Sequence, residues 1–93
     1  MTMDLKTEYN YIIFKKFAQK EKTSVWYCLN KSGDYRLGRI QWNPGWRQYC
    51  FFPEPQELVF SAGCLKDICE FMDNLRNWEK QEVLKMLGKE SAR

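Results

Sequence analysis

The sequence contains no histidine, and this absence removes much of the chemistry that enzymes use. Without an imidazole there is no Ser-His-Asp triad, no Cys-His pair and no histidine base, so an enzyme would depend on carboxylates, lysines or a bare thiol. The chain also lacks the phosphate-binding patterns G-x-x-x-x-G-K and G-x-G-x-x-G and the metalloprotease pattern H-E-x-x-H. We therefore predict a protein that is not an enzyme.

The cysteines do not form a metal-binding pattern either. The four of them are scattered along the chain, at Cys28, Cys50, Cys64 and Cys69. No two form the C-x-x-C pair that is typical of structural zinc sites, so we predict neither a metal nor another cofactor. Two disulfides are compatible with this number, but we favour reduced thiols that pack as small apolar side chains.

Long apolar runs are also missing, and none reaches the roughly 20 residues that a membrane-spanning helix needs. The first ten residues, MTMDLKTEYN, have no apolar segment after a basic start, so we expect no secretory signal and a cytoplasmic location. The hydrophobic fraction of 44% and the aromatic fraction of 16% are too high for a disordered chain. With 93 residues, the chain has the length of a single domain, residues 1–93.

Positive charge is concentrated in the first part of the chain. Residues 1–52 carry nine Lys and Arg against four Asp and Glu, whereas residues 53–93 carry six against eight. Most of the aromatic residues lie in the same first part, which favours an anionic partner there, although ordinary solvated charge gives the same pattern. The net charge of +3 is low for a nucleic-acid-binding domain, so we do not predict sequence-specific DNA binding.

Short segments rich in β-branched and aromatic residues alternate with turn residues. The predicted strands are Tyr9–Gln19, Ser24–Asn30, Tyr35–Trp42 and Trp46–Phe52, with a short fifth strand at Glu57–Ser61. The turns KSGD (31–34) and NPG (43–45) join consecutive strands, with glycine at the position that needs a positive φ. We therefore predict an antiparallel meander of three to five strands over about residues 9–61.

From Leu65 onward the apolar spacing changes to three and four residues, which is typical of a helix. The predicted apolar stripe is Leu65, Ile68, Met72 and Leu75. The helix is predicted over about residues 62–87, with Ser61 as its N-cap and Gly88 at its end, and the fold class is α+β with this helix on one face of the sheet. Its length of about 39 Å exceeds a small sheet, so it either breaks near Asn77 or projects and packs on a partner chain.

Strand alternation and the two predicted turns sort the side chains into two faces. The face expected under the helix is mainly apolar and holds Val25, Tyr27, Leu29, Ile40, Trp42, Trp46, Cys50 and Phe52. The other face mixes rings with two arginines and a glutamine and holds Trp26, Cys28, Leu37, Arg39, Gln41, Arg47, Tyr49 and Phe51. If it is uncovered, such a face has the composition of a binding surface.

The string KTSVWYC…GDYRLGRIQW…WRQYCFFP…LVFSAGCLKDICEF, from Lys22 to Phe71, resembles a group of small uncharacterised proteins encoded by bacteriophages and prophages. Its most specific parts are Leu37-Gly38, Trp42, Trp46–Pro53 and Ser61–Leu65. The group has no settled activity, so no catalytic residue carries over. The resemblance implies a phage accessory protein that acts inside the cytoplasm of a bacterial host cell, where such proteins often inhibit host defence.

Two hypotheses follow for the function. The first is a non-enzymatic binding module that engages a host protein or a nucleotide-like small molecule through Trp26, Arg39, Gln41, Arg47, Tyr49 and Phe51. The second is a structural or assembly protein that forms a homodimer through the helix residues Trp78, Val83, Met86 and Leu87. A purely structural interpretation of the mixed face also stays open, because the first strand or the loop after Phe52 could cover it.

Overall fold

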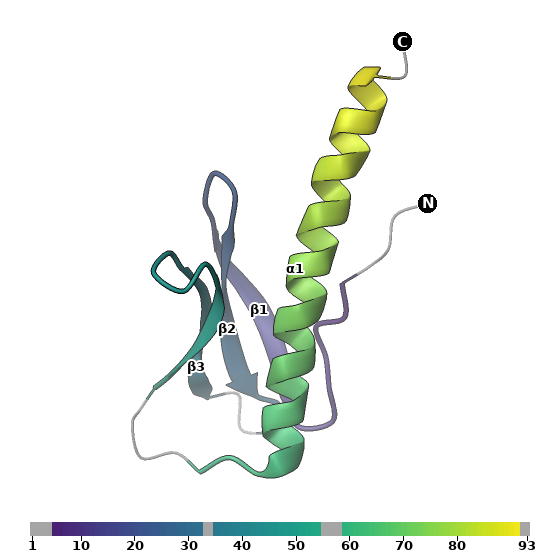
Figure 1. Cartoon of the computed structure of the whole chain (residues 1–93). Coiled ribbons are helices and arrows are strands. Elements are labelled where there is room, and N and C mark those ends of the chain that lie inside the picture. Colours follow the sequence, from purple (N-terminus) through teal and green to yellow (C-terminus); the bar gives the residue numbers. More distant parts are fainter. Residues whose placement is uncertain (1–4, 33–34, 55–58, 92–93) are drawn as a thin grey trace.

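The computed structural model describes residues 5–32, 35–54 and 59–91, and the side chains of these residues as far as position 84. The elements are β1 (Ile12–Gln19), β2 (Ser24–Asn30), β3 (Arg36–Asn43), β4 (Gln48–Pro53) and α1 (Ala62–Ser91). The four strands form one antiparallel sheet in the order β1-β2-β3-β4, and α1 crosses one of its faces (Figure 1). The predicted α+β fold, a meander with one C-terminal helix, is confirmed.

The first and the fifth strand predictions need the largest corrections, and the fourth strand begins at Gln48 rather than at Trp46. The first strand begins at Ile12 rather than at Tyr9, because the preceding segment turns back on it: Tyr9 N donates to Ile12 O at 2.8 Å, and Glu8 forms a bridge with Ile13. Residues 59–61 of the predicted fifth strand are not in a strand, and the rest of that prediction lies outside the described residues.

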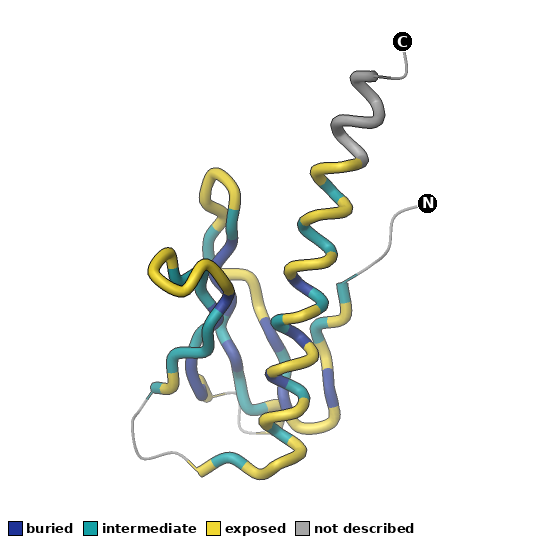
Figure 2. Tube along the Cα trace, viewed as in Figure 1, coloured by how far each residue is buried: buried dark blue, intermediate teal, exposed yellow. Residues whose placement is uncertain are grey.

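The core lies between α1 and the sheet, where buried segments of both face each other (Figure 2). Phe71 is its centre, with an exposed fraction of 0%. Its ring stacks on Phe14, with centroids 4.0 Å apart, and meets the edge of Trp26. Of the predicted stripe, Ile68, Met72 and Leu75 contact this core, but Leu65 is 47% exposed.

The turn between β3 and β4 differs from its prediction in length and in the residue that has a positive φ. It is a four-residue turn, 44–47, closed by a hydrogen bond of 2.7 Å from Arg47 N to Asn43 O. The Asn43 Oδ1 atom also accepts hydrogen bonds from the backbone N–H groups of Gly45 and Trp46. The positive φ, 58°, belongs to Arg47 and not to Gly45.

This turn inverts the predicted orientation of β4. Trp42 pairs with Tyr49 instead of Trp46, which is a shift of three positions (from 46 to 49). Because an odd shift moves every side chain to the other face, the prediction for this strand was wrong throughout. Tyr49 and Phe51 lie on the α1 side, and Cys50 and Phe52 lie on the far side.

A β-bulge inverts β2 as well. The predicted pair of Leu29 with Arg36 is confirmed, but the next pair is Cys28 with Gly38, so Leu37 is an extra residue in β3. Beyond this bulge the register is one residue away from the prediction. Trp26 and Cys28 therefore lie under α1, whereas Val25, Tyr27 and Leu29 lie on the far side.

The helix begins at Ala62, where Ser61 acts as the predicted N-cap: its Oγ accepts a hydrogen bond from Cys64 N at 3.2 Å. It continues without a break through Asn77 to Ser91, so Gly88 does not end it. The far end extends beyond the sheet (Figure 1), so the predicted break near Asn77 is wrong, and the packing of this end on a partner chain stays a prediction. Among the described residues, no helix is apolar enough over the length that a bilayer requires.

Candidate functional site

The six predicted binding residues do not share one surface. Three of them pack in the core, namely Trp26, Tyr49 and Phe51. Arg47 lies in the β3–β4 turn and is exposed. Only Arg39 and Gln41 lie on the face of the sheet that is turned away from α1, which we call the open face, and Arg39 Nε donates to Gln41 Oε1 at 2.9 Å. A mixed face thus exists, but most of its predicted members were wrong.

The actual members form a continuous line of contacts across all four strands. We call this line the open-face row; it consists of Phe17, Tyr27, Arg36, Glu54, Arg39 and Phe52. Tyr27 from β2 lies between Phe17 of β1, with centroids 4.5 Å apart, and the Arg36 guanidinium of β3, which is 4.3 Å from the Tyr27 centroid. Further along, the Arg39 guanidinium lies 4.6 Å from the Phe52 centroid.

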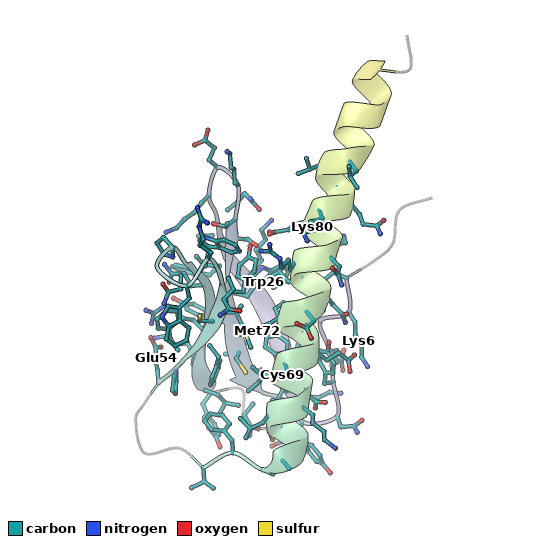
Figure 3. The ribbon with its side chains drawn as sticks, in the orientation of Figure 1. Lys6, Trp26, Glu54, Cys69, Met72 and Lys80 are labelled. Atoms are coloured by element: carbon teal, nitrogen blue, oxygen red, sulfur yellow. The ribbon has the colours of Figure 1, made fainter. Side chains whose placement is uncertain are left out.

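Glu54 joins the two halves of this row. Its Oε2 atom accepts a hydrogen bond from Arg39 Nη1, and its Oε1 atom lies 3.0 Å from Arg36 Nε in an ion pair that does not have hydrogen-bond geometry. The backbone holds Glu54 in place, because Glu54 N donates to Leu37 O at 2.9 Å just beyond the last ladder pair. Figure 3 shows Glu54 on the side of the sheet away from α1, while Trp26 and Met72 lie between the sheet and the helix. The row is therefore fixed in shape before any partner arrives.

A hollow of about 350 Å³ lies over this row, lined also by Lys20 and Gln41. Among the described residues on or beside the open face, four are cations, namely Lys15, Lys20, Arg36 and Arg39, and Glu54 carries a carboxylate. The open face therefore combines one exposed ring, Phe17, and two half-buried rings, Tyr27 and Phe52, with a net positive charge.

A second surface lies where α1 leaves the sheet. This helix groove has a volume of about 550 Å³ and an apolar floor made of Trp42, Tyr49, Val83 and Leu84. Its charged rim consists of Lys22, Arg76, Glu79 and Lys80. The Arg76 guanidinium lies 5.3 Å from the Trp42 centroid. The predicted self-association residue Val83 is exposed here, whereas Trp78 packs against the core and the side chains of Met86 and Leu87 lie outside the described part.

A partly buried polar network closes the inner wall of the helix groove. Glu79 Oε1 accepts the Tyr49 hydroxyl at 2.6 Å, and Glu79 Oε2 accepts Ser24 Oγ at 3.0 Å. Ser24 in turn accepts Trp26 Nε1 at 2.8 Å, and its own backbone N–H donates to the Tyr49 oxygen at 3.1 Å. Burial and the hydrogen bond to Glu79 raise the pKa of Tyr49 to about 12. The carboxylate is thus satisfied from the sheet and fixes α1 to it.

The cysteines and acidic residues do not gather into a site. All four cysteines are free thiols, and burial raises the pKa of Cys28 to about 12, so that side chain remains an unreactive thiol at neutral pH. In the described ranges, no three Cys, Asp or Glu side chains are arranged to hold a metal ion.

Sequence reasoning missed most of both surfaces. The bulge brings Tyr27 and Arg36 to the open face and the turn length brings Phe52 there, and the residue pattern reveals neither. Phe17 lies in β1, for which the sequence predicted no face, and Glu54 follows the last ladder pair of β4. The helix groove had a signal, because Arg76, Lys80 and Leu84 are spaced by four residues and share one face of a helix.

No protein-family model matches this sequence, and neither a curated protein nor a solved structure matches the chain. The fold and the two surfaces define the class of the protein: a small α+β meander with one sheet face under α1 and one that no described helix or strand covers.

Proposed function

We propose that this chain is a non-enzymatic binding protein, of phage accessory type, that engages a partner protein of the host cell through the open-face row. The observation that carries this proposal is the row itself. It is a line of rings and guanidiniums, crossing four strands, that the helix leaves uncovered. Tyr and Arg held in this way are the residue types that dominate the energy of protein–protein interfaces.

The geometry favours a protein over a nucleotide as the partner. A base needs a free ring face, but Tyr27 contacts both Phe17 and Arg36, and a guanidinium lies over Phe52, so Phe17, which is 62% exposed, is the ring of the row that is left for stacking. A phosphate needs free donors, but both arginines already pair with Glu54. A partner protein with an acidic rim gains from the surrounding cations without displacing this carboxylate. Inhibition of a host defence protein is the role that we propose for such an interaction.

The test places a photo-crosslinking amino acid at one position at a time in the full chain, expressed in bacterial cells. Phe17, which is 62% exposed, carries the probe on the open face, and Trp46, which is 68% exposed in the β3–β4 turn, carries the matched control. We expect a discrete protein adduct from position 17 and not from position 46, and we expect Arg39→Glu to remove it. Identical adducts from both positions, or none from position 17, would contradict the proposal.

Native mass spectrometry of the same preparations tests the nucleotide alternative. A co-purifying nucleotide that is lost with Arg39→Glu would make the open face a small-molecule site instead of a protein-binding surface. A bare chain mass, together with the protein adduct at position 17, supports the protein partner.

Self-association through α1 is a second candidate, favoured by the projection of the helix beyond the sheet. Val83 and Leu84 are 55% and 66% exposed on this projecting part. Sedimentation velocity tests it: truncation after Asn77 should convert a dimer into a monomer. A full-length chain that sediments as a monomer at high concentration would exclude this candidate.

A further inference from the structure

We propose that the helix groove is a docking site for an acidic amphipathic helix of a partner protein, separate from the open-face row. The groove lies on the other side of the sheet from the row, and its floor consists of Trp42, Tyr49, Val83 and Leu84. The proposal depends on three observations, which concern the charge of the rim, the spacing along α1 and the charge of this chain's own helix end.

The first observation is that the cations of the rim are unpaired. Within the described part of the chain, Lys22, Arg76 and Lys80 take part in no ion pair. The single carboxylate, Glu79, already accepts one hydrogen bond on each oxygen from the sheet. The open face differs here, because its two arginines share Glu54. Three cations without an ion-pair partner, one of which lies over the Trp42 ring, surround an apolar floor and complement an occupant with acidic groups beside apolar ones.

The second observation is the spacing of the residues on α1. Arg76, Lys80 and Leu84 follow each other at intervals of four, and Glu79 and Val83 repeat the interval one position earlier. Side chains at this interval form a ridge along a helix, and the ridge of one helix packs into the groove of another. Acidic residues one turn apart on a second helix would meet Arg76 and Lys80, while its apolar residues would cover Val83 and Leu84. A small amphipathic anion with one head group would meet only part of this rim.

The third observation decides between a partner and a second copy of this chain. Residues 80–91, the part of α1 that a second copy would bring, carry three lysines against two glutamates. Such a segment adds positive charge to a rim that is already positive. An acidic helix lowers the electrostatic energy of the same groove, so charge favours a partner protein.

The experiment determines which charge a bound helix prefers, without fixing that charge in advance. The full chain is used as bait for a displayed library of amphipathic helical peptides, whose apolar stripe is fixed and whose flanking positions are random. We expect enrichment of Asp and Glu at the flanking positions. The best peptide is then synthesised with a fluorescent label, and its affinity is measured by anisotropy, together with a variant in which each Glu is replaced by Gln.

Two helix variants form a matched pair. Leu84→Glu and Leu65→Glu make the same change on α1, at 66% and 47% exposed side chains, but only the first lies in the helix groove. We expect Leu84→Glu and Lys80→Glu each to weaken peptide binding at least about tenfold, whereas Leu65→Glu leaves it unchanged. Circular dichroism of each variant shows that it is folded.

Several results would overturn the proposal. Selected peptides that are neutral or basic would remove the argument from charge, and binding that survives Leu84→Glu would place the peptide elsewhere. If no peptide is enriched, the groove is not a helix-docking site. Sedimentation of the full chain as a dimer that Leu84→Glu converts into a monomer would assign the groove to a second copy. None of these results affects the crosslinking from Phe17, so the two proposals fail independently.

Discussion

The two faces of the sheet are built from the same residue types, but the rings on each face have different neighbours. On the face under α1, rings meet rings: Phe71 stacks on Phe14 and meets the edge of Trp26. On the open face, rings meet guanidiniums as well as each other: Tyr27 contacts both Phe17 and Arg36. The first arrangement excludes water and supports folding, whereas the second holds polar groups that remain in contact with water. The difference separates the residues that stabilise the fold from those that are available to a partner.

Replacement of Phe71 by alanine should strongly destabilise the packing between α1 and the sheet. The side chain is fully buried, so we expect the variant to lose about 3–5 kcal/mol of unfolding free energy from lost contacts and a residual cavity. The open-face counterpart, Phe17→Ala, should cost less than about 1 kcal/mol because that ring is mostly exposed. Urea denaturation measures both. Equal losses would mean that the two faces do not differ in the way described.

Gly38 tests how tightly the covered face is packed, because this position has no room for an added Cβ. An added Cβ would lie 2.5 Å from the Phe52 carbonyl oxygen and 2.7 Å from the Phe51 ring, which packs over this position. We expect Gly38→Ala to cost about 1–3 kcal/mol, because the ring and the strand must both move. In a Phe51→Ala background the cost should fall but not vanish, since the backbone oxygen remains. A Gly38→Ala variant as stable as the parent would show that the neighbouring strand yields easily.

The sequence was sufficient to predict the order of the elements and the N-cap at Ser61, because strand composition, turn residues and helix periodicity are local signals. It was not sufficient for the faces. The extra residue Leu37 and the four-residue turn that ends at Arg47 each shift a register by an odd number of residues. Bulge formation and a positive φ on arginine depend on tertiary packing, which no local pattern contains.

The same limit explains the outcome for the candidate site. The prediction that one face mixes rings with arginines was sound as a matter of composition, and Arg39 and Gln41 are on that face. The three predicted rings, Trp26, Tyr49 and Phe51, lie on the opposite face, under α1. Because side chains alternate along a strand, a single register error moves every side chain of that strand to the wrong face. The helix groove depends on how far α1 extends past the sheet, and this is a property of the assembled fold.

Alkaline pH tests the inner wall that fixes α1 to the covered face. The pKa of Tyr49 is raised from 10.0 to about 12 in the folded chain, so the unfolded chain releases this proton first. The contribution of the protonated Tyr49 hydroxyl to the free energy of unfolding is therefore complete below about pH 10, and it is lost as the pH rises toward 12. In urea titrations, Tyr49→Phe should therefore show a smaller loss over this range than the parent. Some loss will remain, because the pKa of the Cys28 thiol is raised from 9.0 to about 12 and acts in the same direction. Parallel curves for the two proteins would contradict the role of this hydroxyl.

The smallest expected effect on stability is that of Arg39→Gln on the open face. The change removes the ion pair with Glu54 and the contact with Phe52, but both charged side chains are 33% exposed and Arg36 still pairs with the carboxylate. We expect a loss below about 1 kcal/mol, which should shrink further at high salt because the ions screen a pair that is partly in water.

This variant also separates folding from binding, because the open-face row should matter more to a partner than to the fold. Arg76→Gln is its control, since it removes the guanidinium over Trp42 in the helix groove and leaves the row intact. We expect both variants to unfold at nearly the parent's urea concentration, and only Arg39→Gln to weaken the protein adduct at position 17. A loss of several kcal/mol with Arg39→Gln would instead make the open face a second core, in which the ring and guanidinium contacts hold the sheet together.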